Sequence, residues 1–245
     1  MPDPAAPWSL LASRWEELFP LRPARLDLAL RLAPEGSACL DAGCATGSLC
    51  RALAARGRVA HGLDLEPAFL DHGRARAEAE ALAVTWHQAG LLDLARAAGD
   101  RRFRLVTCLG QTLPHLLEEA EWLDFFSQAR TALEPGGVLV IQVVNDAGLT
   151  VGEVRELPPL RIPGAVLERR RIRVSPDRAR FATRFLPEGG EAVPGVAEHR
   201  IMAPGRAAEL LARAGLEPGP AWADESGAPF AEASPGWVIA ARRSA

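Results

Sequence analysis

The sequence predicts an α/β fold with a mostly parallel sheet, because strand patterns and helix patterns alternate between residues 36 and 145. A second observation is the loop that contains Gly43 and Gly47, which joins the first expected strand to a helix, a place where such sheets bind ligands. A third is the change after Asn145 to short alternating runs, which indicate an antiparallel meander. Together these observations predict a ligand-binding core with an added β segment.

The expected core elements follow one another with short connections. Apolar runs predict strands at 38–42, 59–65, 84–89, 103–110 and 138–145. Periodic apolar patterns predict helices at 48–57, 66–82, near 91–97 and at about 118–133, the last ending at the turn "EPGG". Strands that alternate with such helices form right-handed crossovers, so their carboxyl ends should meet at one edge of the sheet.

The segments around this core have other patterns. Two amphipathic helices are expected at Trp8–Phe19 and Ala24–Leu32, and the meander runs from Val151 to Ala203. Long insertions in compact domains are usually functional or disordered, so we interpret the meander as a lid or side sheet. A helix at 204–215 and a strand at 236–242 return to the core. The resulting parts are a helical cap (1–35), a core (36–150), an antiparallel insertion (151–203) and a closing helix and hairpin (204–245).

Composition narrows the class of partner. A net charge of −3 gives no broad basic surface for nucleic acid. The longest apolar run, "VLVIQVV", is too short to cross a bilayer, and the first residues lack a signal-peptide pattern. The four cysteines show no C-x-x-C spacing, which favours reduced thiols over a metal site. We therefore expect a cytoplasmic protein with a small-molecule partner and with neither metal, nucleic acid nor membrane.

The stretch "LDAGCATGSLCRALAARG" carries the chemistry of the expected site. Its glycines can adopt positive φ and let a ligand approach the backbone, and the helix that follows favours an anionic group. Asp64, at the end of the neighbouring strand, can accept hydrogen bonds from a ribose diol. The spacing from Gly43 to Gly47 does not fit the G-x-G-x-x-G pattern of dinucleotide folds. An adenosine-containing ligand is expected, with a tight turn that binds no ligand as the alternative.

Five segments in order resemble the motifs of the class I S-adenosylmethionine-dependent methyltransferases. They are "LDAGCATG", the acid Asp64, "LLD" with Asp93, "VTCLGQTLPHL" and "LEPGGVLVIQVVN", and the likeness covers about residues 36–145. The resemblance implies a Rossmann-like seven-stranded, mostly parallel sheet whose last strand is antiparallel. It also implies S-adenosylmethionine as the cofactor.

The resemblance assigns cofactor contacts residue by residue. It places the methionine portion on the backbone of Gly43, Ala45 and Gly47, with Asp41 supporting the loop. It places the ribose on Asp64, an adenine face on Leu65 and the adenine edge on Leu92 and Asp93. The carbonyl groups of Leu109 and Gly110 are expected beside the sulfonium.

Within that family, "CLGQTLPHL" and Asn145 resemble the branch of glycine and sarcosine N-methyltransferases and related small-molecule enzymes. That branch usually has "GNS" and "NYD" where this chain has Gly110-Gln111-Thr112 and Asn145-Asp146-Ala147. The chain contains no tyrosine at all, which weighs against glycine as the substrate.

Residues for the acceptor are less defined. His115 is a candidate base, because its pKa is ordinarily near neutrality, or it packs the turn after the fourth strand. Gln111 and Asn145 are further catalytic candidates. Trp15 and Phe19 are candidates for contact with the acceptor, although, like Trp8, they fit helix core better than a cation cage. Arg161 or Arg200 could meet a substrate carboxylate.

The sequence therefore predicts methyl transfer to a nitrogen or oxygen of a small molecule by in-line displacement. Since the donor is already activated, alignment of the acceptor can supply most of the acceleration, and a base is optional. Two alternatives remain: a regulatory module that binds the cofactor without turnover and, disfavoured by the glycine spacing, a nicotinamide-dependent oxidoreductase.

Overall fold

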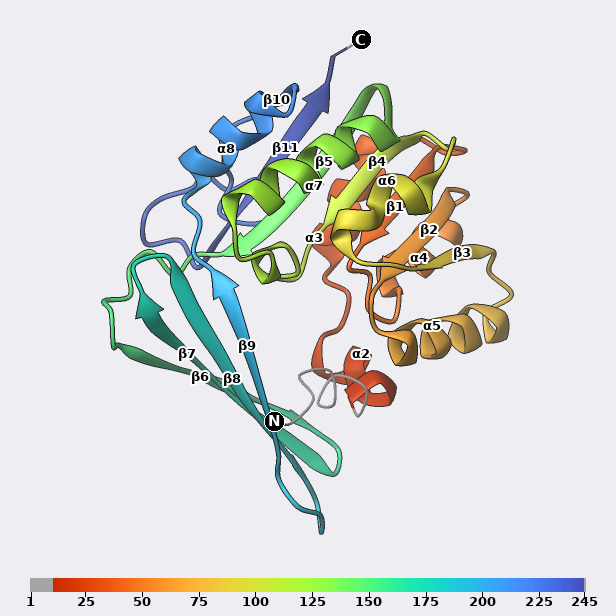
Figure 1. The fold of residues 1–245 in the computed structure, drawn as a ribbon. Helices are drawn as coiled ribbons and strands as arrows, with labels where there is room; N and C mark the ends of the chain where they lie inside the picture. Colours follow the sequence, from red (N-terminus) through yellow and green to blue (C-terminus); the bar gives the residue numbers. More distant parts are fainter. Residues whose placement is uncertain (1–10, 245) are drawn as a thin grey trace.

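A computed structural model describes residues 11–244 and contains two sheets (Figure 1). The larger sheet has seven strands in the order β10-β11-β5-β4-β1-β2-β3, and the smaller has four in the order β6-β7-β8-β9. Only the pairings of β11 with β5 and with β10 are antiparallel in the larger sheet. The predicted fold class is confirmed. Trp8, with the first part of the predicted first helix, lies outside the described residues.

The core alternates strands and helices as predicted. Its strands are β1 (Ala38–Ala42), β2 (Val59–Asp64), β3 (Val84–Gln88), β4 (Phe103–Cys108), β5 (Leu133–Val144), β10 (Leu216–Pro218) and β11 (Gly236–Arg243). Its helices are α3 (Pro23–Leu32), α4 (Ser48–Ala54), α5 (Pro67–Ala79), α6 (Leu94–Ala98), α7 (Glu119–Ala132) and α8 (Pro204–Arg213). Short 3₁₀ turns are η1 (Ala12–Arg14), η2 (Leu91–Asp93) and η3 (Leu113–His115), and α2 spans Trp15–Leu18. No helix among the described residues is both long and apolar enough to span a bilayer.

Helices cover both faces of the larger sheet. Alternate residues of a strand point to opposite faces, so Cys39 of β1 packs with α3 and α4 while its neighbour Leu40 packs with α6 and α7. The side of α7 and α8 buries Trp122, Phe125 and Trp237 completely. Both faces of the strands are therefore closed, which leaves the strand ends as the places for a ligand.

Local sequence explains where the helices begin. Pro67 occupies the first turn of α5, where the Glu66 side chain accepts a hydrogen bond from the Ala68 amide. Helix α7 begins with a capping box in which the side chains of Glu118 and Glu121 satisfy each other's backbone amides. These signals lie within one residue of the predicted helix starts.

The start of β5 differs from the prediction by several residues. The "EPGG" segment was expected as a turn, but it lies inside β5, which begins at Leu133. Leu133 pairs with Phe103, and the register then shifts between Phe103 and Leu105. A bulge at this point absorbs the proline and glycines without ending the strand.

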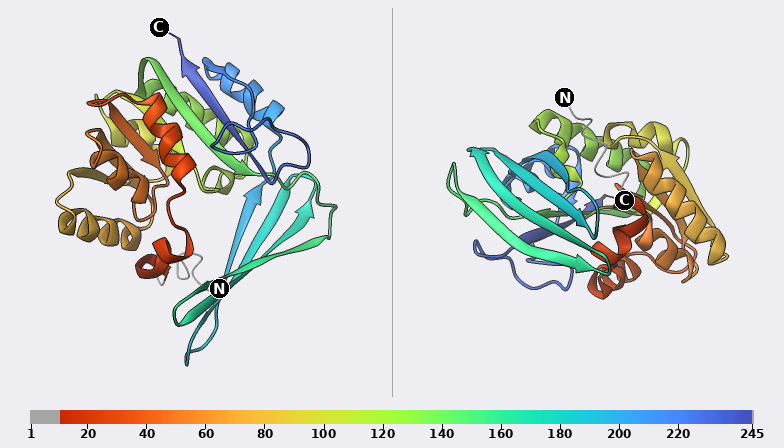
Figure 2. Two further views of the ribbon diagram at one scale, coloured as in Figure 1. Left: turned by 180° about the vertical axis from the view of Figure 1, so that it is seen from behind. Right: turned by 90° about the horizontal axis from the view of Figure 1, so that it is seen from below.

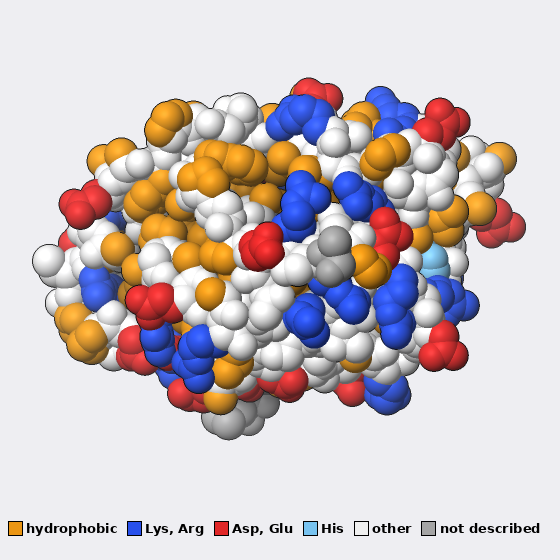
Figure 3. Space-filling view, turned by 90° about the horizontal axis from the view of Figure 1, so that it is seen from above, with side chains coloured by type: hydrophobic (Ala, Val, Ile, Leu, Met, Phe, Trp, Pro, Cys, Tyr) orange, Lys and Arg blue, Asp and Glu red, His pale blue; other side chains and the backbone are white. Residues whose placement is uncertain are grey.

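The insertion forms the small sheet of β6 (Val154–Ile162), β7 (Ala165–Ser175), β8 (Arg178–Pro187) and β9 (Val193–Arg200). It joins the core below the carboxyl ends of the parallel strands and extends toward α2 (Figures 1 and 2). Figure 3 views the molecule from the opposite end, where apolar and charged side chains are mixed on the surface. The carboxyl ends of the parallel strands therefore face the small sheet and α2.

Candidate functional site

The loop after β1 is fixed to β2 by its backbone. The amides of Gly43 and Cys44 donate to the Leu63 carbonyl at 2.7 and 3.0 Å. Gly43, Ala45 and Gly47 all have positive φ, at 76°, 47° and 69°. The left-handed conformations expected for the two glycines are thus present, and Ala45 shares them at some cost in strain.

The space beside the two glycines is filled by protein side chains. A Cβ atom on Gly43 would lie 2.2 Å from Thr112 Cγ2, and one on Gly47 would lie 2.3 Å from the Trp86 ring. Sequence reasoning assigned the glycines to positive φ and to the approach of a ligand. The structure adds a packing reason, because Thr112 and Trp86 require them, and a ligand would meet the loop along its backbone edge.

Asp64 joins this loop to the next helix. Its Oδ2 accepts from the Ala45 amide at 2.8 Å and its Oδ1 accepts from the Glu66 amide at 3.0 Å. Burial raises the pKa of Asp64, and these backbone amides oppose that rise. Each carboxylate oxygen has a second lone pair, so the group can still accept ribose hydroxyls. Beside it, Leu65 is 72% exposed, an open apolar surface of the kind that a purine ring covers.

Asp41 lies below the loop and links β1 to β4. It is 8% exposed, and its Oδ1 accepts from the Thr107 hydroxyl at 2.6 Å. Asp41 and Thr107 are also partners in the parallel register. Burial raises the pKa of Asp41 to about 6, while the Thr107 hydrogen bond acts in the opposite direction. This contact between β1 and β4 is consistent with the supporting role expected for Asp41.

The segment expected at the adenine edge follows β3. The Ala89 amide donates to the Asp64 carbonyl at 3.0 Å, which brings η2 beside the end of β2. Asp93 is half exposed and accepts from Arg96 at 3.0 Å, and the Leu92 carbonyl accepts from Gln128. The structure thus places Leu92 and Asp93 near Asp64, with Asp93 engaged by a surface arginine.

The turn after β4 is held by side-chain contacts. The Leu109 carbonyl accepts from the Thr112 hydroxyl at 3.0 Å, and the Gly110 amide donates to Gln142 Oε1 at 2.9 Å. Gln111 has a φ of 73°, and its Oε1 accepts from the Val144 amide at 2.6 Å. Gln111 therefore spans the ends of β4 and β5, with its carbonyl oxygen occupied by the backbone.

The structure corrects the expectation for Asn145. Its Nδ2 donates to the Glu232 and Ser234 carbonyls at 2.8 and 3.0 Å, and its Oδ1 accepts from the Ala147 amide at 3.2 Å. Both amide protons are used inside the protein, so Asn145 fixes the segment before β11 instead of contacting an acceptor.

His115 ends a chain of hydrogen bonds that begins at a buried ion pair. Arg171 donates from Nε to both Asp146 carboxylate oxygens at 2.8 Å and from NH2 toward His199 Nδ1 at 3.3 Å. His199 Nε2 then lies 3.3 Å from His115 Nε2. Arginine has only donors, so His199 Nδ1 must accept and its Nε2 must carry the proton. His115 Nε2 is therefore the acceptor, and its Nδ1 bears the hydrogen.

This arrangement changes the role expected for His115. Desolvation by the surrounding protein lowers the pKa of His115, and the charge of Arg171 lowers it further. Part of the His115 side chain nevertheless reaches solvent. Its basic nitrogen faces His199. The geometry fits a neutral hydrogen-bond donor and does not fit the predicted base.

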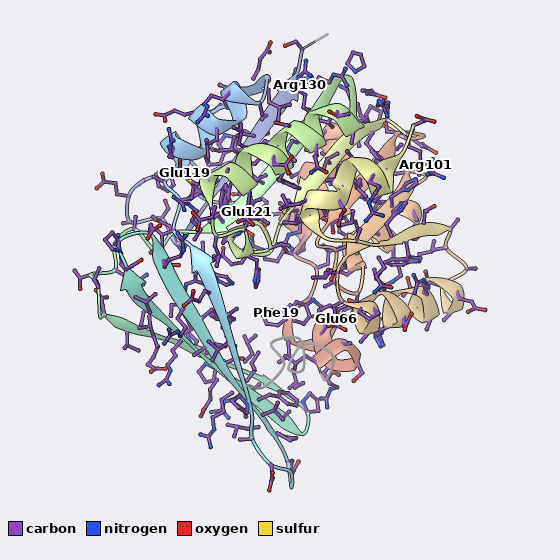
Figure 4. All side chains as sticks on the ribbon, in the orientation of Figure 1. Phe19, Glu66, Arg101, Glu119, Glu121 and Arg130 are labelled. Atoms are coloured by element: carbon purple, nitrogen blue, oxygen red, sulfur yellow. The ribbon has the colours of Figure 1, made fainter. Side chains whose placement is uncertain are left out.

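Trp15 of α2 and Phe19, the residue after that helix, pack on the small sheet, and Trp15 also contacts α5. The Trp15 ring lies 4.5 Å from Phe19 and 4.7 Å from Phe69 of α5, measured between centroids. Trp15 and Phe19 also pack with an apolar cluster that includes Leu167 and Phe185 of the small sheet. Figure 4 labels Phe19, which follows α2, and Glu66, which precedes α5, below the larger sheet in that view. Packing in this cluster agrees with the helix-core interpretation of these rings.

A second set of contacts joins α2 to the end of the loop after β1. Glu16 accepts from Arg51 at 2.8 Å and from the Thr46 hydroxyl at 2.8 Å. Arg51 is 5% exposed and also pairs with Glu80, the residue after α5, at 3.1 Å. Sequence reasoning missed this clamp, because Glu16, Arg51 and Glu80 are far apart in the sequence.

The two arginines proposed for a substrate carboxylate are placed elsewhere. Arg200 donates to the Leu117 carbonyl at 2.7 Å and pairs with Glu119 at 3.2 Å. Arg161 is exposed near the far end of the small sheet and borders a surface hollow with Glu188. Neither side chain faces the strand ends, because Arg200 serves the junction of β9 and α7 and Arg161 lies at the opposite end of the insertion.

Comparisons with known proteins agree with this geometry. Residues 39–137 match the family model of a methyltransferase domain. The ubiquinone biosynthesis O-methyltransferase of Xanthomonas campestris pv. campestris is 31% identical over 146 residues, which are 56% of this chain and 59% of that protein. The matches to the first curated relatives span 41 to 59% of their lengths.

Solved structures match over most of the chain. The CcbJ methyltransferase of Streptomyces caelestis is 26% identical, with a TM-score of 0.78 over 91% of this chain and 89% of that one. An S-adenosylmethionine-dependent methyltransferase of Clostridium acetobutylicum has a TM-score of 0.82 at 14% identity, over 97% and 99%. The fold is thus that of the S-adenosylmethionine-dependent methyltransferases, residues 39–137 match the model of a methyltransferase domain, and S-adenosylmethionine is the cofactor of this class of enzyme. The narrower glycine and sarcosine branch stays a prediction.

The packing of Gly47 yields a stability prediction. Gly47→Ala should lower the free energy of unfolding by about 2 kcal/mol or more, because it adds a left-handed alanine and a clash with Trp86. Urea unfolding measures the loss, with Gly148→Ala as control, since a Cβ there meets open space. Equal midpoints for both variants would contradict the packing role.

The raised pKa of Asp41 yields a pH prediction. Below about pH 4 both the folded and the unfolded carboxyl are protonated, and between there and about pH 6 only the folded one keeps its proton. Wild-type stability should therefore fall across this interval. Asp41→Asn should gain on wild type as pH rises, by at most about 3 kcal/mol at pH 7. The check is urea unfolding of both proteins from pH 4 to pH 7, and a constant difference would refute it.

Proposed function

We propose that this protein transfers a methyl group from S-adenosylmethionine to a nitrogen or oxygen of a small molecule. The observation that carries the proposal is Asp64, which accepts from the Ala45 amide while the exposed Leu65 lies beside it. A carboxylate at a strand end, an apolar face and a left-handed loop are the three surfaces needed for a ribose, a purine and an amino-acid tail.

The residues of this chain would hold and orient the cofactor. Asp64 would accept the ribose hydroxyls, Leu65 would cover an adenine face, and the loop 43–47 would contact the methionine portion along its backbone. Leu92 and Asp93 would lie at the adenine edge, and Leu109 and Gly110 near the sulfonium. When bound, the cofactor supplies an activated methyl group, so the protein's task is alignment and exclusion of water.

The acceptor would lie between the strand ends, the small sheet and α2. His115 approaches this space from η3, and Trp15 with Phe19 closes the side of α2. His115 would donate from Nδ1 to a polar atom of the acceptor and hold its nucleophile in line. A neutral acceptor nitrogen or oxygen that releases its proton to solvent after transfer needs no protein base.

The similarity to an enzyme named for ubiquinone biosynthesis supports a small-molecule acceptor. The likeness covers only part of both chains, so the acceptor itself belongs to the proposal. The branch that contains glycine and sarcosine N-methyltransferases remains part of the proposal through "CLGQTLPHL", with glycine itself disfavoured by the lack of tyrosine.

Cofactor binding is the first test. Titration calorimetry should show binding of S-adenosylmethionine to wild type, and Asp64→Ala should weaken it by about thirtyfold or more through the loss of a charge-assisted contact. Asp71→Ala is the matched control, since that carboxylate is 72% exposed on α5. A wild type without binding would contradict the proposal.

Turnover separates an enzyme from a regulatory module. A labelled methyl group should appear on members of a panel of small amines, phenols and carboxylates. Tight cofactor binding without transfer to any of them would favour the module.

The hydrogen-bond chain predicts one tautomer of His115. Side-chain ¹⁵N NMR of wild type should show neutral His115 protonated at Nδ1, and His199→Phe should allow both tautomers because it removes the donor to Nε2. His72, outside the chain, should keep its signals. Protonation of wild-type His115 at Nε2 would refute this assignment.

A further inference from the structure

The side of the small sheet that faces the strand ends, here called the inner face, is defined by alternation along β7. Arg171 on this face contacts Asp146 and His199, while Arg170, its neighbour in sequence, is exposed on the other face. Cross-strand partners share a face, and Arg169 pairs with Thr183, which pairs with Gly195. Arg169, Thr183 and Gly195 therefore form one row across the inner face.

This row lies in the middle of the inner face. On the core side of Arg169, Arg171 belongs to the hydrogen-bond chain that ends at His115. On its other side, Leu167 and Phe185 pack with Trp15 and Phe19 at α2. Arg169 is thus held between the two boundaries of the proposed acceptor space.

Arg169 lacks an anionic partner within the described residues. Its NH2 donates to the Pro158 carbonyl at 2.9 Å, but its Nε is buried without a hydrogen-bond partner, and no described carboxylate forms an ion pair with it. Burial lowers the pKa of Arg169, and no acid offsets that effect. A partly buried, unpaired guanidinium costs free energy unless it serves a ligand.

Thr183 adds a second unused polar group. It is only 8% exposed, no hydrogen bond of its hydroxyl occurs among residues 11–244, and its oxygen is not sealed from solvent. Gly195, the partner of Thr183 on the next strand, has no side chain, and Ala197 has only a methyl group. A cation and a hydroxyl thus occupy neighbouring strands in one row of the inner face, with no large side chain next to them on β9.

The acids of this sheet do not compete for the position. Glu156 is opposite Arg170, Glu168 pairs with Arg184 at 3.6 Å, and Glu198 pairs with Arg180 at 3.5 Å, all on the exposed face. Asp146, which does reach the inner side, is occupied by Arg171. The charge beside Thr183 is therefore positive.

We propose that Arg169 and Thr183 form a subsite for an anionic oxygen group, a carboxylate or phosphate, on the methyl acceptor. The assignment of this anionic group to a methyl acceptor rests on the proposed function, whereas the anion site itself does not. The planar guanidinium offers parallel donors that match two oxygens of such a group, and Thr183 offers a third donor. The anion would anchor the acceptor under the small sheet, on the side of His115.

Binding of simple probes tests the subsite without knowledge of the acceptor. Calorimetry with benzoate, phenyl phosphate and neutral benzamide would be run on full-length protein, with and without S-adenosylhomocysteine. The two anions, or one of them, should bind at least tenfold more tightly than benzamide. Arg169→Gln should remove at least tenfold of that affinity, Arg169→Lys less, and Thr183→Val about threefold. Arg170→Gln, on the exposed face, is the matched control and should change nothing.

The outcomes separate the two proposals. Preference for benzoate or for phenyl phosphate identifies the group. Failure of both anions to bind more tightly than benzamide, or anion affinities unchanged in Arg169→Gln, would overturn the subsite. If S-adenosylhomocysteine binds while the anions fail, the subsite alone falls. If it fails to bind while anions bind through Arg169, the methyltransferase proposal falls and the anion site stands.

Discussion

The hydrogen bond from the Ala45 amide to the Asp64 carboxylate is the contact on which the rest of the site depends. It fixes the left-handed loop after β1 against the end of β2, and the same carboxylate holds the start of α5 through the Glu66 amide. Because Asp64 is largely surrounded by protein, this contact acts in a medium of lower polarity than water, where charge-assisted hydrogen bonds are stronger. One side chain thereby sets the relative positions of the three surfaces assigned to the cofactor.

The small sheet depends on a different contact to become part of the site. The buried pair of Arg171 and Asp146 joins β7 to the segment after β5, and His199 extends it to His115. Breaking such a pair leaves an uncompensated charge, so the orientation of the sheet over the strand ends is strongly specified. The same sheet that contacts His115 carries Arg169 on its inner face, so under the proposed function it would both align and recognise the acceptor.

The larger sheet could be predicted from the sequence because its signals are local. The alternation of apolar strands and periodic helices, the glycines of the first loop and the acid at Asp64 all lie in short windows, and the structure places them together. The acceptor side could not be predicted in this way. Asn145, Arg200 and His115 have their roles set by partners that are 83 to 89 residues away in the sequence. The arginines at 169–171 form a single charged run in the sequence, but alternation along β7 separates the exposed Arg170 from Arg169 and Arg171, which point inward.

A crystal structure with S-adenosylhomocysteine tests the central claim most directly. The account predicts the ribose hydroxyls within hydrogen-bond distance of Asp64, the adenine against Leu65 and the amino-acid tail along residues 43–47. A ligand bound away from the Asp64 carboxylate, or a nucleoside site closed by Thr112 and Trp86, would contradict it.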